Sequence, residues 1–190
     1  MSWYLNSVSI ETWAYADNVF TAQECDSIIE IGKKTGLENG KLSDGSVDFE
    51  YRKSKILFFN SNNSSFNWIY QRVTDAVNII NKQFWNYDLS YIEDLQFTSY
   101  TEKDDFFTKH IDQISQGGNY RKLSFSIQLS SPNNYEGSDL LLHTSSNYLT
   151  TRKEKGTMIF FPSFVLHEVT PLISGERYSL VGWVCGPSFK

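Results

Sequence analysis

Apolar residues in the first half of the chain recur at helical spacing in two stretches. The first begins at Thr21-Ala-Gln-Glu24, a capping box in which the Thr and Glu side chains can satisfy each other's free main-chain amides. It predicts a helix that ends at Gly36, a residue that readily terminates helices. The second predicted helix covers residues 64–84, where Phe66, Ile69, Val73, Val77 and Ile80 form one apolar stripe.

Residues 38–48, between the two predicted helices, are rich in Gly, Ser, Asn and Asp. This composition predicts an exposed loop. Such a loop could be a lid over a binding site or plain surface, and the sequence leaves both interpretations open.

From residue 91 onward the pattern changes to short apolar runs separated by turn residues. Strands are predicted at residues 91–100, 106–111, 122–130, 139–144, 157–161 and 177–185. Helices packed on several antiparallel strands predict an α+β fold with a double-stranded β-helix (jelly-roll) core. We expect a single domain over residues 1–190, with helical support mainly in 1–90 and the jelly-roll core mainly in 91–190.

The predicted strand at residues 122–130 alternates strictly between apolar and polar side chains. One face carries Leu123, Phe125, Ile127 and Leu129, and the other carries Ser124, Ser126, Gln128 and Ser130. We expect the apolar face to meet the helices. The polar face then points either to solvent or into the barrel, and alternation alone does not choose.

Composition narrows the range of partners and compartments. The formal net charge is −5 and no basic run occurs, which argues against binding to nucleic acid or an anionic membrane through a general electrostatic patch. No signal peptide and no apolar stretch of membrane-spanning length are evident, so we expect a soluble, cytoplasmic protein. Cys25 and Cys185 are expected to be free buried thiols, with one disulfide as the alternative.

The candidate chemistry lies in His110, Asp112 and His167, in a chain with only 3 His. Residues i and i+2 of a strand share a face, so His110 and Asp112 can converge on one ion. Two imidazoles and one carboxylate are the ligand set of non-haem Fe(II) oxygenases, which leaves positions open for a co-substrate and O₂. An H-x-D pair alone is a weak signal, and its simpler interpretation is an ordinary surface or core histidine. The apolar strand 157–161 before His167 favours the metal site.

Arg177 and Ser179 lie ten and twelve positions past His167, in an apolar strand. A guanidinium on a buried strand needs an anionic partner, and the carboxylate of a 2-oxo acid would serve through bidentate hydrogen bonds. The alternative is a surface arginine after the turn at 174–176. His143 is interpreted as a structural histidine.

The chain resembles the prolyl 4-hydroxylase-like branch of the Fe(II)/2-oxoglutarate oxygenases, including the PKHD-type proteins. The resemblance spans nearly the whole chain. It rests on residues 19–25, Arg52-Lys-Ser54, residues 96–100, Phe107-Thr-Lys-His110-Ile-Asp112, residues 123–130, 135–140 and 156–162, His167-Glu-Val-Thr-Pro171, Gly175-Glu-Arg177-Tyr-Ser179 and Trp183. One departure is Gly137-Ser138-Asp139, where the family usually has Gly-Gly before the acidic residue.

This resemblance implies roles for individual residues. His110, Asp112 and His167 would bind Fe(II), and Arg177 with Ser179 would bind the far carboxylate of the co-substrate 2-oxoglutarate. Tyr100 would hydrogen-bond the co-substrate, although a packed core tyrosine fits equally well. Gln128 stands where some members have a Tyr that contacts the co-substrate, and would substitute for it.

The resemblance further implies an oxygenase that consumes O₂, releases succinate and CO₂, and hydroxylates a prolyl residue of a peptide or protein, with ascorbate as an accessory reductant. A small molecule or another amino-acid side chain is the alternative substrate. The candidate peptide groove comprises residues 38–48 and 112–120. A different class of function, a non-catalytic jelly-roll binding module with a structural metal or none, also remains open. The oligomeric state is not indicated by the sequence.

Overall fold

A computed structural model of the chain describes residues 11–42, 45–116, 118–144 and 147–189. The two predicted helices are confirmed. Helix α1 (Ala22–Thr35) starts at the predicted capping box on Thr21 and ends before Gly36, whose φ of 88° is one that glycine tolerates. Helix α2 (Asn67–Phe84) follows a 3-10 turn, η1 (Ser64–Phe66), and buries most of its predicted stripe.

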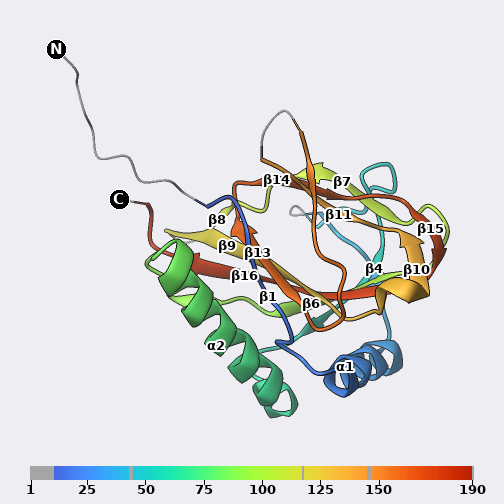
Figure 1. The fold of residues 1–190 in the computed structure, drawn as a ribbon, viewed down its shortest axis with the longest axis horizontal. Helices are drawn as coiled ribbons and strands as arrows, with labels where there is room; N and C mark the ends of the chain where they lie inside the picture. The colour runs from blue at the N-terminus through green and yellow to red at the C-terminus, as the bar shows by residue number, and fades with distance from the viewer. Residues whose placement is uncertain (1–10, 43–44, 117, 145–146, 190) are drawn as a thin grey trace.

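The strands form two main antiparallel sheets (Figure 1). Along the larger sheet the order is β1 (Ala14–Ala16), β13 (Met158–Pro162), β9 (Asn119–Gln128), β16 (Arg177–Gly186), β6 (Leu95–Tyr100), β4 (Lys55–Phe59) and β2 (Glu38–Asn39). Two short strands lie outside this order: β5 (Tyr91–Ile92) pairs with β16, and β8 (Ser115–Gln116) pairs with β9. The smaller sheet runs β12 (Leu149–Thr150), β11 (Leu140–His143), β14 (Leu166–Val169), β7 (Phe106–His110) and β3 (Arg52–Lys53). A separate pair joins β10 (Tyr135–Gly137) to β15 (Leu172–Gly175).

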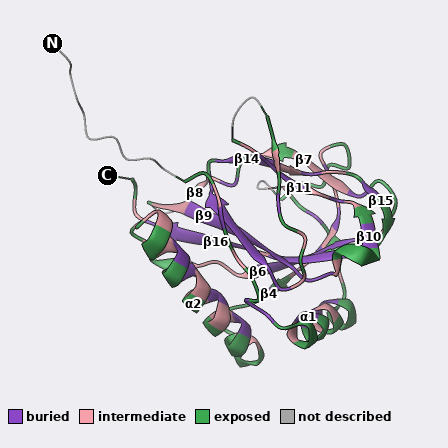
Figure 2. Ribbon diagram, in the orientation of Figure 1, coloured by how far each residue is buried: buried purple, intermediate pink, exposed green. Residues whose placement is uncertain are grey.

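Both helices lie against one face of the larger sheet, and the smaller sheet lies on its other side (Figure 1). The strands of the larger sheet are largely buried, whereas each helix is buried along one side only (Figure 2). This arrangement confirms the predicted α+β jelly roll, in which helices support one of two facing sheets.

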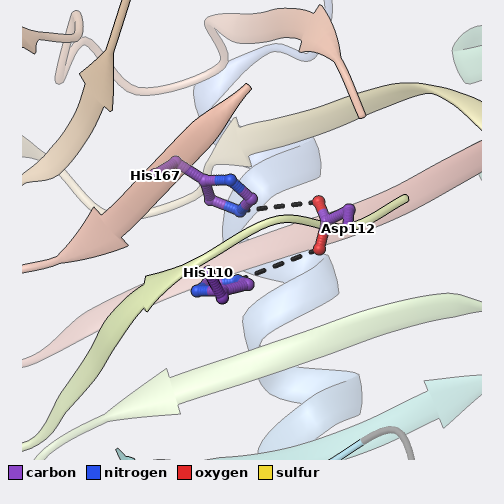
Figure 3. A group of neighbouring side chains, drawn as sticks. All are labelled: His110, Asp112 and His167. Atoms are coloured by element: carbon purple, nitrogen blue, oxygen red, sulfur yellow. Dashed lines mark ion pairs between the residues drawn. The ribbon is translucent and has the colours of Figure 1, made fainter. Parts of the chain in front are cut away.

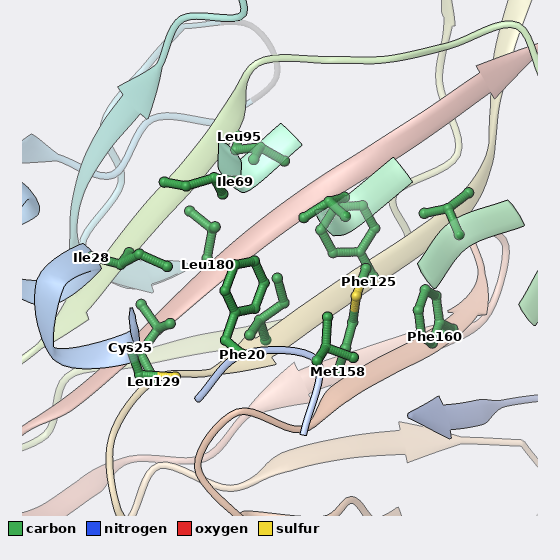
Figure 4. Close-up of a cluster of buried hydrophobic side chains, with 14 of the residues drawn as sticks. Phe20, Cys25, Ile28, Ile69, Leu95, Phe125, Leu129, Met158, Phe160 and Leu180 are labelled. Carbon is green, nitrogen blue, oxygen red and sulfur yellow. The ribbon is translucent and has the colours of Figure 1, made fainter. Parts of the chain in front are cut away.

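The hydrophobic core fills the space between the helices and the larger sheet (Figure 4). The apolar face of β9 contributes to this core, as predicted, through Leu123, Phe125, Ile127 and Leu129. The opposite face of β9 is also buried, since Ser124, Ser126 and Gln128 are each at most 5% exposed. The sequence pattern allowed the polar face of β9 to point to solvent or into the barrel, and in the structure it points into the barrel.

The first 90 residues contain both helices and four strands, β1 to β4. Three predictions about the elements need correction. Residues 38–48 are not wholly a loop, because β2 pairs with β4 and buries Gly40; residues 43–44 lie outside the described part. The predicted strand 91–100 is two strands, β5 and β6, and β7 stops at His110, so Asp112 follows the strand instead of lying on it.

The cysteine prediction is confirmed, because Cys25 and Cys185 are both buried and free. Within the described residues, no helix combines the length and the apolar character that a membrane span requires.

Candidate functional site

The two sheets bring the three candidate metal ligands together from separate segments. His167 on β14 stands directly opposite His110, the last residue of β7, and the two rings lie 4.1 Å apart between centroids. Asp112 lies two residues beyond His110, where its main-chain N–H donates to the carbonyl of Ser163 at 3.0 Å. This bond holds the end of the segment after β7 against the turn that precedes β14.

The carboxylate of Asp112 lies beside the two imidazoles and turns one oxygen toward each ring (Figure 3). Its Oδ1 is 3.8 Å from His110 Nε2, and its Oδ2 is 3.5 Å from His167 Nε2. One ligand atom from each residue falls within 4.8 Å of the others, a separation that a single ion can bridge.

Main-chain carbonyls fix the orientation of both rings. His110 Nδ1 lies 2.7 Å from the carbonyl oxygen of Thr108, and His167 Nδ1 lies 3.0 Å from that of Val165. A carbonyl only accepts, so each Nδ1 carries a proton and donates. Each Nε2 is left with a lone pair directed at the site, which is the usual arrangement of a metal-binding histidine.

The electrostatics of His110 and Asp112 also favour a metal site. Burial, together with repulsion from His167, lowers the pKa of His110 to about 4, so that its imidazole is neutral at neutral pH. Burial opposes ionisation of Asp112, but attraction to His167 and His110 holds its pKa below the ordinary value. Two neutral nitrogens and one carboxylate oxygen suit Fe(II) and leave coordination positions free.

A cavity between the sheets connects this triad with the predicted co-substrate residues. Its walls include Tyr100, Arg177 and Ser179 from the larger sheet, and the triad from the other side. Tyr100 stands opposite Arg177 across β6 and β16, and Gln128 stands opposite Ser179 across β9 and β16. The four predicted residues therefore lie on neighbouring strands of one sheet.

Arg177 is 2% exposed and forms no ion pair with any described residue. Its Nη2 donates to Oε1 of Gln128 at 3.2 Å, and its guanidinium lies 5.4 Å from the centroid of the Tyr100 ring. Its Nη1 is buried and has no partner among the described residues. An unpaired buried cation is costly, so this position is suited to a bound carboxylate, as the 2-oxo acid requires.

Tyr100 is fully buried at the cavity wall. Burial raises the pKa of its phenol, and this effect is larger than the opposing attraction of Arg52 and Arg177 for the phenolate. The hydroxyl therefore remains a hydrogen-bond donor at neutral pH.

His143 lies apart from the cluster, as its structural interpretation expected. Its Nε2 lies 2.8 Å from Oε1 of Glu168 on the neighbouring strand β14. Ser138, the departure from the family pattern, adopts φ 48° with a buried hydroxyl that has no partner in the described part of the chain.

Sequence reasoning assigned no role to Arg52, which the structure places in the cavity wall together with Phe107. The only signal was its place in the Arg52-Lys-Ser54 motif. Strand β3 is two residues long, too short for hydrophobic periodicity to reveal.

Comparison with known proteins agrees with this geometry. The family model of the 2OG-Fe(II) oxygenase superfamily matches residues 95–185. A PKHD-type hydroxylase of Hyphomonas neptunium is 39% identical over 84 residues, which is 42% of this chain and 38% of the relative. A PKHD-type hydroxylase of Synechococcus sp. is 38% identical over 76 residues, which is 40% of this chain and 34% of the relative. The chain thus matches little more than a third of the length of these relatives.

Solved structures share the fold. A prolyl hydroxylase from Trichoplax adhaerens, in complex with a peptide fragment of the hypoxia inducible factor oxygen degradation domain, aligns with a TM-score of 0.77 at 17% identity, over 91% of this chain and 83% of the other. A prolyl-4-hydroxylase from Pseudomonas putida aligns with a TM-score of 0.74 at 18% identity, over 93% and 94%. These solved structures show the fold of the chain, and the family model and the PKHD-type relatives show that residues 95–185, just under half of the chain, are similar to the 2OG-Fe(II) oxygenase superfamily.

Proposed function

We propose that this chain is an Fe(II)- and 2-oxoglutarate-dependent oxygenase, acting as one domain. His110, Asp112 and His167 hold the iron, and Arg177 with Ser179 holds the far carboxylate of 2-oxoglutarate. The observation that carries this proposal is the buried, unpaired guanidinium of Arg177 in the same cavity as the triad. A structural metal site would have no use for such a cation.

When bound, iron and 2-oxoglutarate supply the oxidation, in which O₂ is consumed, succinate and CO₂ are released, and a substrate C–H becomes C–OH. The protein's own residues orient the metal ligands and the co-substrate, and they exclude water from the cavity. The carbonyls of Thr108 and Val165 fix both imidazoles, Gln128 orients Arg177, and Tyr100 offers a hydroxyl at the cavity wall. Apolar side chains such as Phe107, Phe161 and Val169 keep water from the cavity.

We further propose a prolyl residue of a peptide or protein as the substrate. The support is the fold shared with prolyl hydroxylases, one of them in complex with a peptide. Proline-containing peptides that gain no oxygen by mass spectrometry, while 2-oxoglutarate is being consumed, would move the substrate to another side chain or a small molecule.

The first test is Fe(II)-dependent conversion of 2-oxoglutarate to succinate by the purified chain. We expect turnover in the wild type and its loss in His167→Ala, which removes one nitrogen ligand. His143→Gln is the matched control, because this histidine lies outside the triad and pairs with Glu168.

Turnover that survives in His167→Ala contradicts the proposed metal site. A wild type that binds neither Fe(II) nor 2-oxoglutarate contradicts the proposed function as a whole, and supports the non-catalytic binding module.

A further inference from the structure

A second buried arginine lies in the wall of the cavity. Arg52 on β3 is 4% exposed and belongs to the smaller sheet, whereas Arg177 belongs to the larger one. Its Nε donates to Ser54 Oγ at 2.7 Å, and its Nη1 donates to the carbonyl of Lys41 at 3.4 Å, a long bond. Both partners are neutral, so the charge of Arg52 is not compensated by them.

No described carboxylate forms an ion pair with Arg52. Burial lowers the pKa of Arg52, and the attraction of Tyr100 and Asp112 acts in the opposite direction. The guanidinium nevertheless remains charged at neutral pH. Burying a charge without a counter-ion is strongly unfavourable, so such a residue is expected to serve a ligand.

The charges in the cavity wall indicate whether this ligand is an anion or a cation. The charged side chains in the wall are Arg52, Arg177 and Asp112. An imidazole that keeps its proton on Nδ1 and binds a metal through Nε2 adds no charge of its own. The charged side chains therefore sum to one positive charge. Bound Fe(II) and the dianion of 2-oxoglutarate cancel each other, so the loaded cavity still carries one positive charge. Because Arg177 would then be paired with the co-substrate, the remaining charge lies on Arg52.

The surroundings of Arg52 hold its guanidinium in one orientation. The ring of Phe107 contacts both Arg52 and a candidate metal ligand, because its centroid lies 4.5 Å from the guanidinium carbon of Arg52 and 3.6 Å from the ring centroid of His110. Gly40 also packs closely, since a Cβ added there would lie 2.5 Å from Arg52 Nε and 2.8 Å from Ser54 Oγ. The arginine is therefore held by Phe107 and Gly40, and no described residue accepts a hydrogen bond from its Nη2.

From this geometry we infer that Arg52 forms an anion subsite for the substrate, which carries a carboxylate close to the carbon that is hydroxylated. The inference rests on the proposed function and narrows its substrate class to acids. The carboxylate comes either from an acidic side chain of a peptide or from the free carboxyl group of a small acid. Since the chain as a whole carries a charge of −5, no general positive field attracts such a substrate, and its recognition depends on this local cation.

The test measures binding of matched acid and amide probes to the full chain by titration calorimetry. The chain is first saturated with Mn(II) and N-oxalylglycine, an unreactive analogue of 2-oxoglutarate, so that Arg177 is occupied. The peptide probes are blocked hexapeptides with one central Pro and a Glu or a Gln at each flanking position in turn. The small-molecule probes are N-acetyl-L-proline and N-acetyl-L-prolinamide.

In at least one pair we expect the acid to bind about 10- to 100-fold more tightly than its amide, as one charge-assisted hydrogen bond provides. Arg52→Gln should reduce this ratio to about twofold, and Arg52→Lys should retain part of it. Lys53→Gln is the matched control, because Lys53 is the next residue on β3 and lies outside the cavity wall. It should keep the wild-type ratio. A preference for the acid among the hexapeptides indicates a peptide substrate, whereas a preference for N-acetyl-L-proline over its amide indicates a small acid.

Equal binding of acid and amide in every pair, including no binding of either, overturns the inference, and so does a preference that survives in Arg52→Gln. An Arg52→Gln variant that instead loses affinity for N-oxalylglycine assigns Arg52 to the co-substrate, which also overturns it. If Arg52→Gln does not fold, the wild-type ratio and the Arg52→Lys variant still decide. Succinate formation by the wild type is measured separately, so failure of the subsite is distinct from failure of the proposed function.

Discussion

Replacing Arg177 by Met should stabilise the ligand-free protein while removing its response to 2-oxoglutarate. Arg177 is 2% exposed, with one buried nitrogen that has no partner in the described residues. A buried unsatisfied charged donor costs about 1–3 kcal/mol, and Met of similar length removes that cost. The loss of the bond to Gln128 opposes this gain by about 1 kcal/mol. The expected net gain is about 0–2 kcal/mol, which is up to roughly 8 °C in Tm for a chain of this size.

The order should reverse when the ligands are present. With Mn(II) and with 2-oxoglutarate at about 100 times its wild-type Kd, binding stabilises the wild type by roughly 2.7 kcal/mol. Loss of the carboxylate clamp should weaken binding about 100-fold. At the same concentration the variant then gains only about 0.4 kcal/mol. The wild type should therefore melt at or below Arg177→Met without ligand, and above it with ligand.

Thermal melts with EDTA, and then with Mn(II) and 2-oxoglutarate, check both halves of this expectation. Arg152→Met is the control, because Arg152 is an exposed arginine paired with Asp17 at 3.6 Å. Its melting temperature should change little in either condition. An Arg177→Met variant that is less stable than the wild type without ligand, or that keeps the full response to 2-oxoglutarate, contradicts the proposed role of Arg177.

Two further expectations concern stability. Because burial and His167 lower the pKa of His110 to about 4, the unfolded chain binds more protons than the metal-free folded protein as pH falls below 6.5. The unfolding free energy in EDTA should therefore drop by about 2 kcal/mol from pH 7 to pH 5, as urea titration would measure, and an equal drop in His110→Gln would contradict this. Ser138→Gly should raise the unfolding free energy by about 1 kcal/mol in the same assay, because it relieves a left-handed backbone and removes an unpaired buried hydroxyl, whereas destabilisation would contradict this.

The local pattern of the sequence determined the elements that are long enough to show a period. Helices α1 and α2 follow from their apolar stripes and the capping box at Thr21. The longer strands, such as β9, follow from alternation, because side chains on a strand point to opposite faces in turn. The fold class and the three candidate metal ligands could be proposed on these grounds.

Strands of two or three residues could not be predicted, because they have no periodicity of their own. Strand β3 exists because β7 supplies its hydrogen-bonding partner, and β1 exists because it pairs with β13. Arg52 enters the cavity only through that pairing. The sequence showed the residue but carried no local signal of its burial.

The tertiary structure also decided which faces and registers meet. Alternation left two directions for the polar face of β9, and burial between the sheets turned it inward, where Gln128 reaches Arg177. His110 and His167 are 57 positions apart along the chain, and they meet because the register of β7 and β14 places them opposite each other. Such a register depends on how two distant strands bury their faces together, so local pattern proposes the ligands and only long-range pairing assembles the site.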